Sequence, residues 1–168
     1  MSAATIRIDM VSDTREFPRH ETVVLYVTTA FQLALLIVQL VLGFWLALFA
    51  VFPPYRQTAP FFMASMMNSM FGMPDLALHM GLGMVIAFVS VMILIVSLLS
   101  GRISCMVMSV VAMAAVLFAG IGGMGFVWSG FGNDVFSFIM AIGALAAVVS
   151  YSIQLGSISA AAGKKAIA

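Results

Sequence analysis

Four long apolar runs follow one another along the chain, and short polar breaks separate them. The stretch from Val23 to Gly163 contains only four charged residues, which fall at gaps between the runs: Arg56, Asp75, Arg102 and Asp134. A bilayer has a hydrocarbon core about 30 Å thick, which about 20 helical residues cross. Each run is long enough to do so. The pattern therefore predicts an all-α membrane protein, a four-helix transmembrane bundle.

The breaks between the runs also predict where each span begins and ends. We expect a polar N-terminal arm at 1–22, spans at 23–52, 75–100, 103–128 and 134–157, an outer loop at 53–74 and a tail at 158–168. Pro53 and Pro54 cannot continue the first helix, and the Asp134 carboxylate can cap the start of the fourth. The first run is too long for the apolar part of a signal peptide, so we expect it to stay in the membrane.

Composition supports this fold and excludes several functions. Hydrophobic residues make up 64% of the chain and charged residues 8%, so there is no room for a separate soluble domain. A net charge of +1 predicts no attraction to nucleic acid. The single cysteine, Cys105, excludes an internal disulfide, and the sequence has no motif for zinc or for covalent haem attachment.

Cationic residues predict the orientation. Six of the seven would lie on one side of the membrane, and Arg56 would lie on the other; the six are Arg7, Arg15, Arg19, Arg102, Lys164 and Lys165. The positive-inside rule then makes both termini cytoplasmic, and the 53–74 loop faces outward. We expect a multi-pass protein of the plasma membrane. The N-terminal arm is either a docking arm for a partner or a solvated tail beside lipid headgroups.

Small residues recur along the predicted helix faces. They are Gly83, Ser90 and Ser97 on the second helix, Cys105, Ser109, Ala112, Ala119 and Gly123 on the third, and Gly143, Ala147, Ser150 and Gln154 on the fourth. Small residues let helices approach closely in lipid, so these stripes predict the inner seams of the bundle. A second interpretation is that they make room for a flat cofactor.

His79 is the candidate ligand of the apolar region. It lies about one turn into the second helix, at a depth where polar residues are costly and often functional. Imidazole binds haem iron and other transition metals, and Gly83, one turn further, would let a porphyrin edge approach the backbone. Gln39 could contact the cofactor or hydrogen-bond across the seam. The alternative is a histidine hydrogen-bonded to a neighbouring helix or to water.

Methionines in the outer loop suggest a second kind of site. Met63, Met66, Met67 and Met70 recur at spacings of three or four, as on one face of a helix. Thioether sulfur is a soft ligand for Cu(I), so copper binding is one interpretation. The other is an interfacial helix over 61–71 that needs no metal, because the chain holds 15 methionines in all.

Two further motifs carry no catalytic prediction. Residues 120–125 match G-x-G-x-x-G, but they lie inside a span without a preceding strand, so we do not expect dinucleotide binding. These glycines either loosen the third helix or leave space near His79. The spans contain no Ser/His/Asp set for nucleophilic catalysis. They also contain no pair of carboxylates, which argues against a proton-coupled transporter.

The layout resembles one four-helix half of haem A synthase and, more loosely, small membrane b-type cytochromes. The resembling pieces are the run 39–43, His79 with Gly83, and the Gly-rich run 119–125. The resemblance implies cytoplasmic termini, a large first outer loop and haem held near the outer face. In the family pattern Glu-x-x-His-Arg, however, Leu76 and Met80 replace the flanking residues. The fourth helix also lacks the second axial histidine.

The resemblance implies haem held by His79, with Met80 or Met140 as the local candidates for a second ligand. The missing glutamate and second histidine argue against haem A synthase activity. Three hypotheses of function follow. The chain is a haem-binding protein for electron transfer or a respiratory membrane complex, a cofactor-free accessory subunit of a larger membrane assembly, or an outward-facing Cu(I)-handling protein. We expect membrane lipid and other membrane subunits, or a second copy of the chain, as partners.

Overall fold

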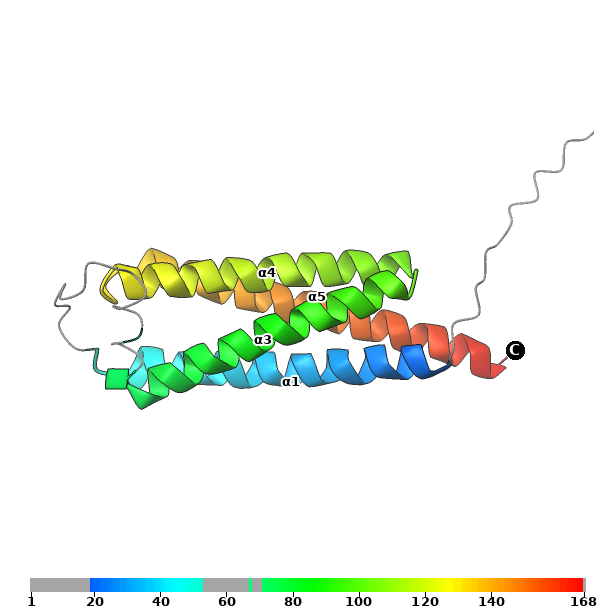
Figure 1. Ribbon diagram of the computed structural model, residues 1–168, viewed down its shortest axis with the longest axis horizontal. Helices are drawn as coiled ribbons and strands as arrows, with labels where there is room; N and C mark the ends of the chain where they lie inside the picture. Colours follow the sequence, from blue (N-terminus) through cyan, green and yellow to red (C-terminus); the bar gives the residue numbers. More distant parts are fainter. Residues whose placement is uncertain (1–18, 53–66, 68–70, 168) are drawn as a thin grey trace, which may run out of the picture.

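The computed structural model describes residues 19–52, 67 and 71–167, and this part of the chain is helical with short connections (Figure 1). Its four long helices are α1 (Arg19–Phe49), α3 (Pro74–Leu99), α4 (Ile103–Trp128) and α5 (Asp134–Ile167). Each is long and apolar enough to cross a membrane. The prediction of an all-α fold with four helices able to span a membrane is confirmed for the described residues.

The observed helix bounds agree with the predicted spans at some ends and differ from them at others. The third predicted span, 103–128, coincides with α4, and α3 begins at Pro74, a residue suited to the first helical position. By contrast, α1 runs from Arg19 to Phe49 rather than over 23–52. α5 continues to Ile167, ten residues beyond 157, because the alanine-rich stretch that follows is a good helix former.

The predicted Met-rich helix over 61–71 lies mostly outside the described residues. Met67 and Phe71 are described, and both are helical and exposed. The structure of the remainder of this segment stays a prediction.

The helices form a ring in which each contacts two neighbours. α1 packs on α3 and α5, and α4 packs on α3 and α5, with the α4–α5 contact the most extensive. In Figure 1, α3 runs obliquely from the side of α1 to the side of α4. The described ends of the chain, at Arg19 and Ile167, lie at the same end of the bundle. We refer to it as the terminal end and to the opposite one as the loop end.

Glycine makes the close α4–α5 contact possible. A Cβ added to Gly143 would lie 2.6 Å from the backbone nitrogen of Ala119, and one added to Gly122 would lie 2.7 Å from that of Met140. Both are closer than real Cβ contacts, so only glycine fits. The small-residue stripes thus lie in helix seams, as small-residue packing predicts, with Cys105 and Ala147 fully buried.

A tight turn lies at one end of the bundle, and a cluster of three aromatic rings lies at the other. At the terminal end, Gly101 takes a positive φ of 63° between α3 and α4. At the loop end, three rings pack together: Phe52 stacks on Phe131 with centroids 4.7 Å apart, and Phe126 meets both edge-on. Phe131 has a φ of 64°, which is uncommon for a side-chain-bearing residue. The stack ties the end of α1 to the α4–α5 turn.

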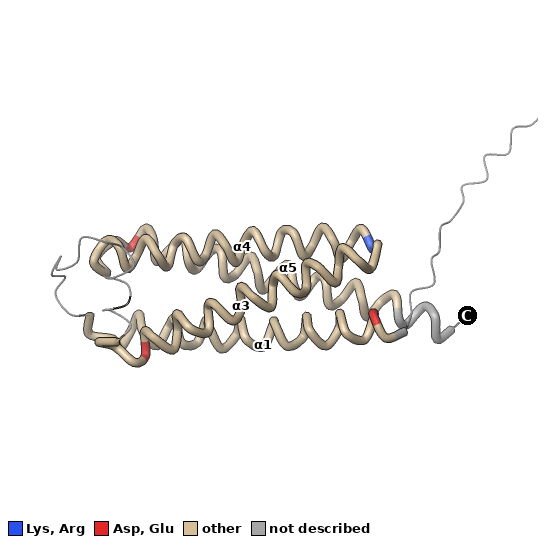
Figure 2. The backbone as a smooth tube through the Cα atoms, in the orientation of Figure 1, with Lys and Arg blue, Asp and Glu red and all other residues tan. Residues whose placement is uncertain are grey.

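Charge is distributed unequally between the two ends. The first turns of α3 and α5 carry Asp75 and Asp134 at the loop end. Figure 2 shows acidic residues at both ends, because Glu21 lies in the first turn of α1 at the terminal end, where Arg102 follows α3. The long middle of the bundle carries no charged residue in its described part.

Candidate functional site

The antiparallel packing of α1 on α3 brings Gln39 against His79 near the loop end. The Gln39 side-chain amide donates to the His79 carbonyl oxygen at 3.0 Å and lies 3.2 Å from His79 Nε2. The carbonyl oxygen can only accept, so it fixes the amide with its NH₂ toward the ring. Because that NH₂ group only donates, Nε2 acts as the acceptor and the ring proton lies on Nδ1.

Two glycines make room for this pair. A Cβ added to Gly43 would lie 3.3 Å from His79 Cε1, so Gly43 accommodates the imidazole. A Cβ added to Gly83 would lie 3.5 Å from Gln39 Nε2, so Gly83 faces the amide. The structure thus brings together His79, Gly83 and Gln39, three of the predicted site residues. It adds Gly43, whose spacing of four from Gln39 places both on one face of α1.

The pair leaves two buried polar atoms without a partner. His79 Nδ1 and Gln39 Oε1 are both buried and make no hydrogen bond. With the ring proton on Nδ1, the site has one unused donor and one unused acceptor. Buried polar groups are normally paired with protein or ordered water. The chemistry of the site therefore matches a small polar molecule such as water.

The residues present do not fit a haem in this arrangement. The lone pair of His79 Nε2 faces the Gln39 amide, and that amide occupies the space beside Gly83 through which a porphyrin edge would approach. Met80 follows His79 directly on α3, so it points about 100° away around the helix. The site therefore offers neither a free Nε2 lone pair nor an opposed second ligand on α3.

Met140, the other candidate for a second ligand, packs against α4. It is on α5, the helix that lies opposite α3 across the described ring. Its sulfur lies 3.4 Å from the position of a Cβ on Gly123 of α4. Gly122 and Gly125 likewise face α5, against Met140 and Phe136. These third-helix glycines accommodate α5, and no described contact joins them to His79.

The predicted copper site falls almost entirely outside the described residues. Met63, Met66 and Met70 are not described, and Met67 is 53% exposed. Within the described part of the chain, no three His, Cys, Asp or Glu residues are grouped as metal ligands. Copper binding by the four methionines stays a prediction.

The structure adds a polar cluster at the centre of the bundle. The Gln32 amide donates to the Ile86 carbonyl oxygen at 3.0 Å and to Ser90 Oγ at 2.8 Å, which joins α1 to α3. The Tyr151 hydroxyl of α5 lies beside Gln32 and Ser90, outside the geometry of a hydrogen bond. Thr29 Oγ1 and Gln32 Oε1 are also buried and unpaired.

A second polar cluster lies nearer the terminal end. Ser97 and Ser109 are 2.7 Å apart through their hydroxyl oxygens. Ser109 donates to Gln154 Oε1 at 3.1 Å, and Gln154 Nε2 donates to Ser97 Oγ at 3.2 Å. All three side chains are fully buried. The triad joins α3, α4 and α5, and Gln154 reaches across the ring to the opposite helix α3.

Comparisons with known proteins found no relative of this chain. No family model matches the chain, and neither a curated protein nor a solved structure matches it. The resemblance to haem A synthase stays a prediction.

Proposed function

We propose that this protein is a cofactor-free accessory subunit of a larger membrane assembly. The observation that carries the proposal is the position of Gln39, whose amide occupies both the Nε2 face of His79 and the space beside Gly83. The imidazole of His79 is thereby used to hold α1 to α3. A structural role accounts for this arrangement without a bound group.

The other polar side chains of the interior support the same function. Gln32 joins α1 to α3, and the triad of Ser97, Ser109 and Gln154 joins three helices. Hydrogen bonds of this kind stabilise the association of helices in lipid. Meanwhile the outer faces are apolar, as at Phe44 and Leu48, which are 65% and 73% exposed. Such faces suit lipid or the helices of another subunit.

We further propose that both termini are cytoplasmic and that the protein resides in the plasma membrane. The excess of cationic residues at the terminal end supports this orientation through the positive-inside rule. The outer loop and the His79 site would then lie toward the outside.

Purification of the protein at its native level tests the function. In mild detergent we expect it to migrate on a native gel with partner subunits, well above the 17.9 kDa of the chain. We also expect no Soret band and no stoichiometric iron or copper. Migration as a lone chain would contradict the accessory role.

The same preparation tests the haem-binding alternative, which the depth of His79 within the second span favours. One haem per chain, lost in His79→Ala and kept in His20→Ala, would establish it and overturn our proposal. His20 is the matched control because it is exposed at the far end of α1.

A further inference from the structure

The polar cluster at the centre of the bundle has hydrogen-bonding groups that it does not use. Its members are Gln32 of α1, Ser90 of α3 and Tyr151 of α5, and all three side chains are fully buried. Gln32 Oε1 and the Tyr151 hydroxyl make no hydrogen bond with any described residue. Buried polar groups are normally paired with protein or with ordered water. The cluster therefore has the character of a binding site.

The hydrogen bonds that the cluster does make determine which groups remain. The Gln32 NH₂ group uses both of its protons, one on the Ile86 carbonyl oxygen at 3.0 Å and one on Ser90 Oγ at 2.8 Å. These bonds fix the orientation of the amide, whose Oε1 can only accept. Ser90 donates to the same carbonyl oxygen at 2.8 Å, so one lone pair of its Oγ is unused. The cluster thus offers two acceptors.

The Tyr151 hydroxyl adds a donor to these two acceptors. It lies beside the side chains of Gln32 and Ser90, but outside the geometry of a direct hydrogen bond. A water molecule among the three groups completes the set. Its two protons match the two acceptors, and its oxygen can accept from the phenol.

Apolar residues close the cluster along the axis of the bundle. Leu36 and Ile86 lie about one turn toward the loop end, and Ile93 lies about one turn toward the terminal end; each is at most 3% exposed. The described middle of the bundle carries no charged residue. A cation buried there would have no carboxylate to balance it, which is costly. The surroundings therefore suit a neutral molecule better than Na⁺.

We propose that a single water molecule is bound between Gln32, Ser90 and Tyr151 at the centre of the bundle. It donates to Gln32 Oε1 and to Ser90 Oγ, and it accepts from the Tyr151 hydroxyl. Because water-mediated hydrogen bonds are nearly as favourable as direct ones, this molecule joins α5 to α1 and α3. The inference is independent of the accessory role, because a haem-binding bundle with the same interior would hold the same water.

Solid-state NMR of the full chain in lipid bilayers tests the proposal. Magnetisation is transferred from water to the protein, and the side-chain amide protons of Gln32 report on it, because this side chain is fully buried. We expect a water signal at the Gln32 amide in the unmodified chain. The double variant Ser90→Ala/Tyr151→Phe should lose this signal. A buried water makes about three hydrogen bonds, and only the one to Gln32 Oε1 would remain.

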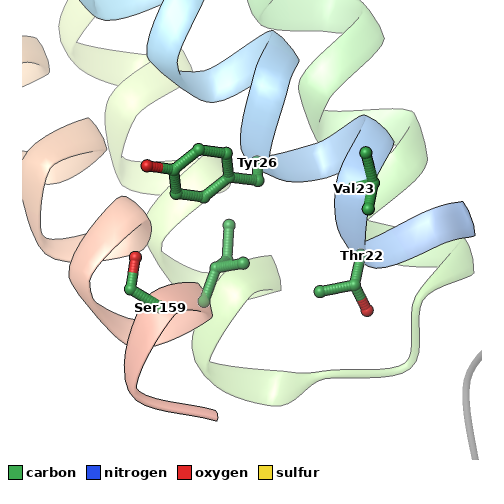
Figure 3. Close-up of a pocket in the computed structure, with 5 residues that line it drawn as sticks. Thr22, Val23, Tyr26 and Ser159 are labelled. Carbon is green, nitrogen blue, oxygen red and sulfur yellow. The ribbon is translucent and has the colours of Figure 1, made fainter. Parts of the chain in front are cut away.

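A second double variant removes the same two hydroxyl types away from the proposed site. Tyr26 lines a pocket between α1 and α5 at the terminal end (Figure 3) and is 44% exposed. Ser150 is buried like Ser90, but it donates within its own helix to the Ala146 carbonyl oxygen at 2.8 Å. Tyr26→Phe/Ser150→Ala should therefore keep the water signal at Gln32.

Three outcomes would overturn the proposal. The first is no water signal at Gln32 in the unmodified chain, since Tyr151 would then bond directly to its neighbours. The second is an unchanged signal in the folded Ser90→Ala/Tyr151→Phe variant, which would mean that water reaches Gln32 without this site. The third is a stability that rises with Na⁺ at constant ionic strength and no longer does so in that variant, which would assign the site to a cation.

A single variant serves if the double variant does not fold. Tyr151→Phe keeps the ring and removes only the donor, so we expect a weaker water signal at Gln32 than in the unmodified chain. Tyr26→Phe is its matched control and should leave the signal unchanged. Equal signals in these two variants would also overturn the proposal.

Discussion

Gln39 of α1 contacts His79 of α3 at two points, donating to its carbonyl oxygen at 3.0 Å and lying 3.2 Å from its ring Nε2. One side chain thereby holds both the backbone and the imidazole of the neighbouring helix. Gly43 and Gly83 leave the space in which the two side chains meet. This contact joins α1 to α3 at the loop end of the bundle.

Loss of the Gln39 amide should loosen this end of the bundle. We expect Gln39→Leu to lower the free energy of unfolding by about 1 kcal/mol, the scale of an interhelical hydrogen bond in a membrane. The variant should also make His79 more reactive toward diethyl pyrocarbonate, because Nε2 becomes free. Unfolding in mixed micelles and mass spectrometry of the modified peptide measure the two effects.

A control separates the hydrogen bonds from the general effect of a substitution. Val38→Leu alters the adjacent residue, whose side chain is 50% exposed, and should change neither stability nor reactivity. If Gln39→Leu behaved like Val38→Leu, the two contacts would have no energetic role.

The sequence was informative about the helices because each span carries its own signal. Long apolar runs, the prolines after Phe52 and before Asp75, and the charges at the gaps each act locally, so the spans could be placed without knowing their neighbours. The end of α5 was harder to place. No polar break separates 157 from the alanine-rich stretch, which lets the helix continue to Ile167.

The site was harder to predict because it depends on how the helices pair. Their spacing in the sequence placed His79 and Gly83 on one face of α3. The same spacing is found whether that face is open or covered by Gln39 of α1. Only the register of α1 against α3 decides between them. The glycines of the third helix present the same problem, since periodicity could not tell whether Gly122 faces His79 or α5.

The buried triad offers a direct measure of coupling across the ring. Gln154 and Ser97 come from opposite helices and hydrogen-bond at 3.2 Å. We expect a double-mutant cycle of Gln154→Leu and Ser97→Ala to give a coupling energy of about 0.6 kcal/mol, the average found for hydrogen bonds between membrane helices. The cycle is measured by unfolding in mixed micelles.

A matched cycle supplies the control for this coupling. Gln154→Leu combined with Ser152→Ala should show additive effects, because Ser152 is exposed and donates within its own helix to Val148. Equal coupling in the two cycles would mean that the triad does not join α5 to α3.

The α4–α5 seam should tolerate no added methyl group at its closest point. Gly143→Ala would place a Cβ 2.6 Å from the Ala119 nitrogen, so we expect a loss of about 1–3 kcal/mol in the free energy of unfolding. Gly156→Ala is the control on the same helix, where an added Cβ meets nothing within 4 Å. It should stabilise the protein by about 0.5–1 kcal/mol through helix propensity. Equal effects in the two variants would contradict the close seam.

The proposed orientation predicts a specific pattern of cysteine labelling. Six of the seven cationic side chains belong to the two termini and the α3–α4 turn, and the positive-inside rule retains such segments in the cytoplasm. A membrane-impermeant maleimide should therefore label Met66→Cys in intact cells, and Lys164→Cys only after the cells are permeabilised. The unmodified chain is the control, because its single Cys105 is fully buried and should stay unlabelled in both conditions. If intact cells labelled Lys164→Cys and not Met66→Cys, the terminal end would face outward, and the charge distribution would not have determined the topology.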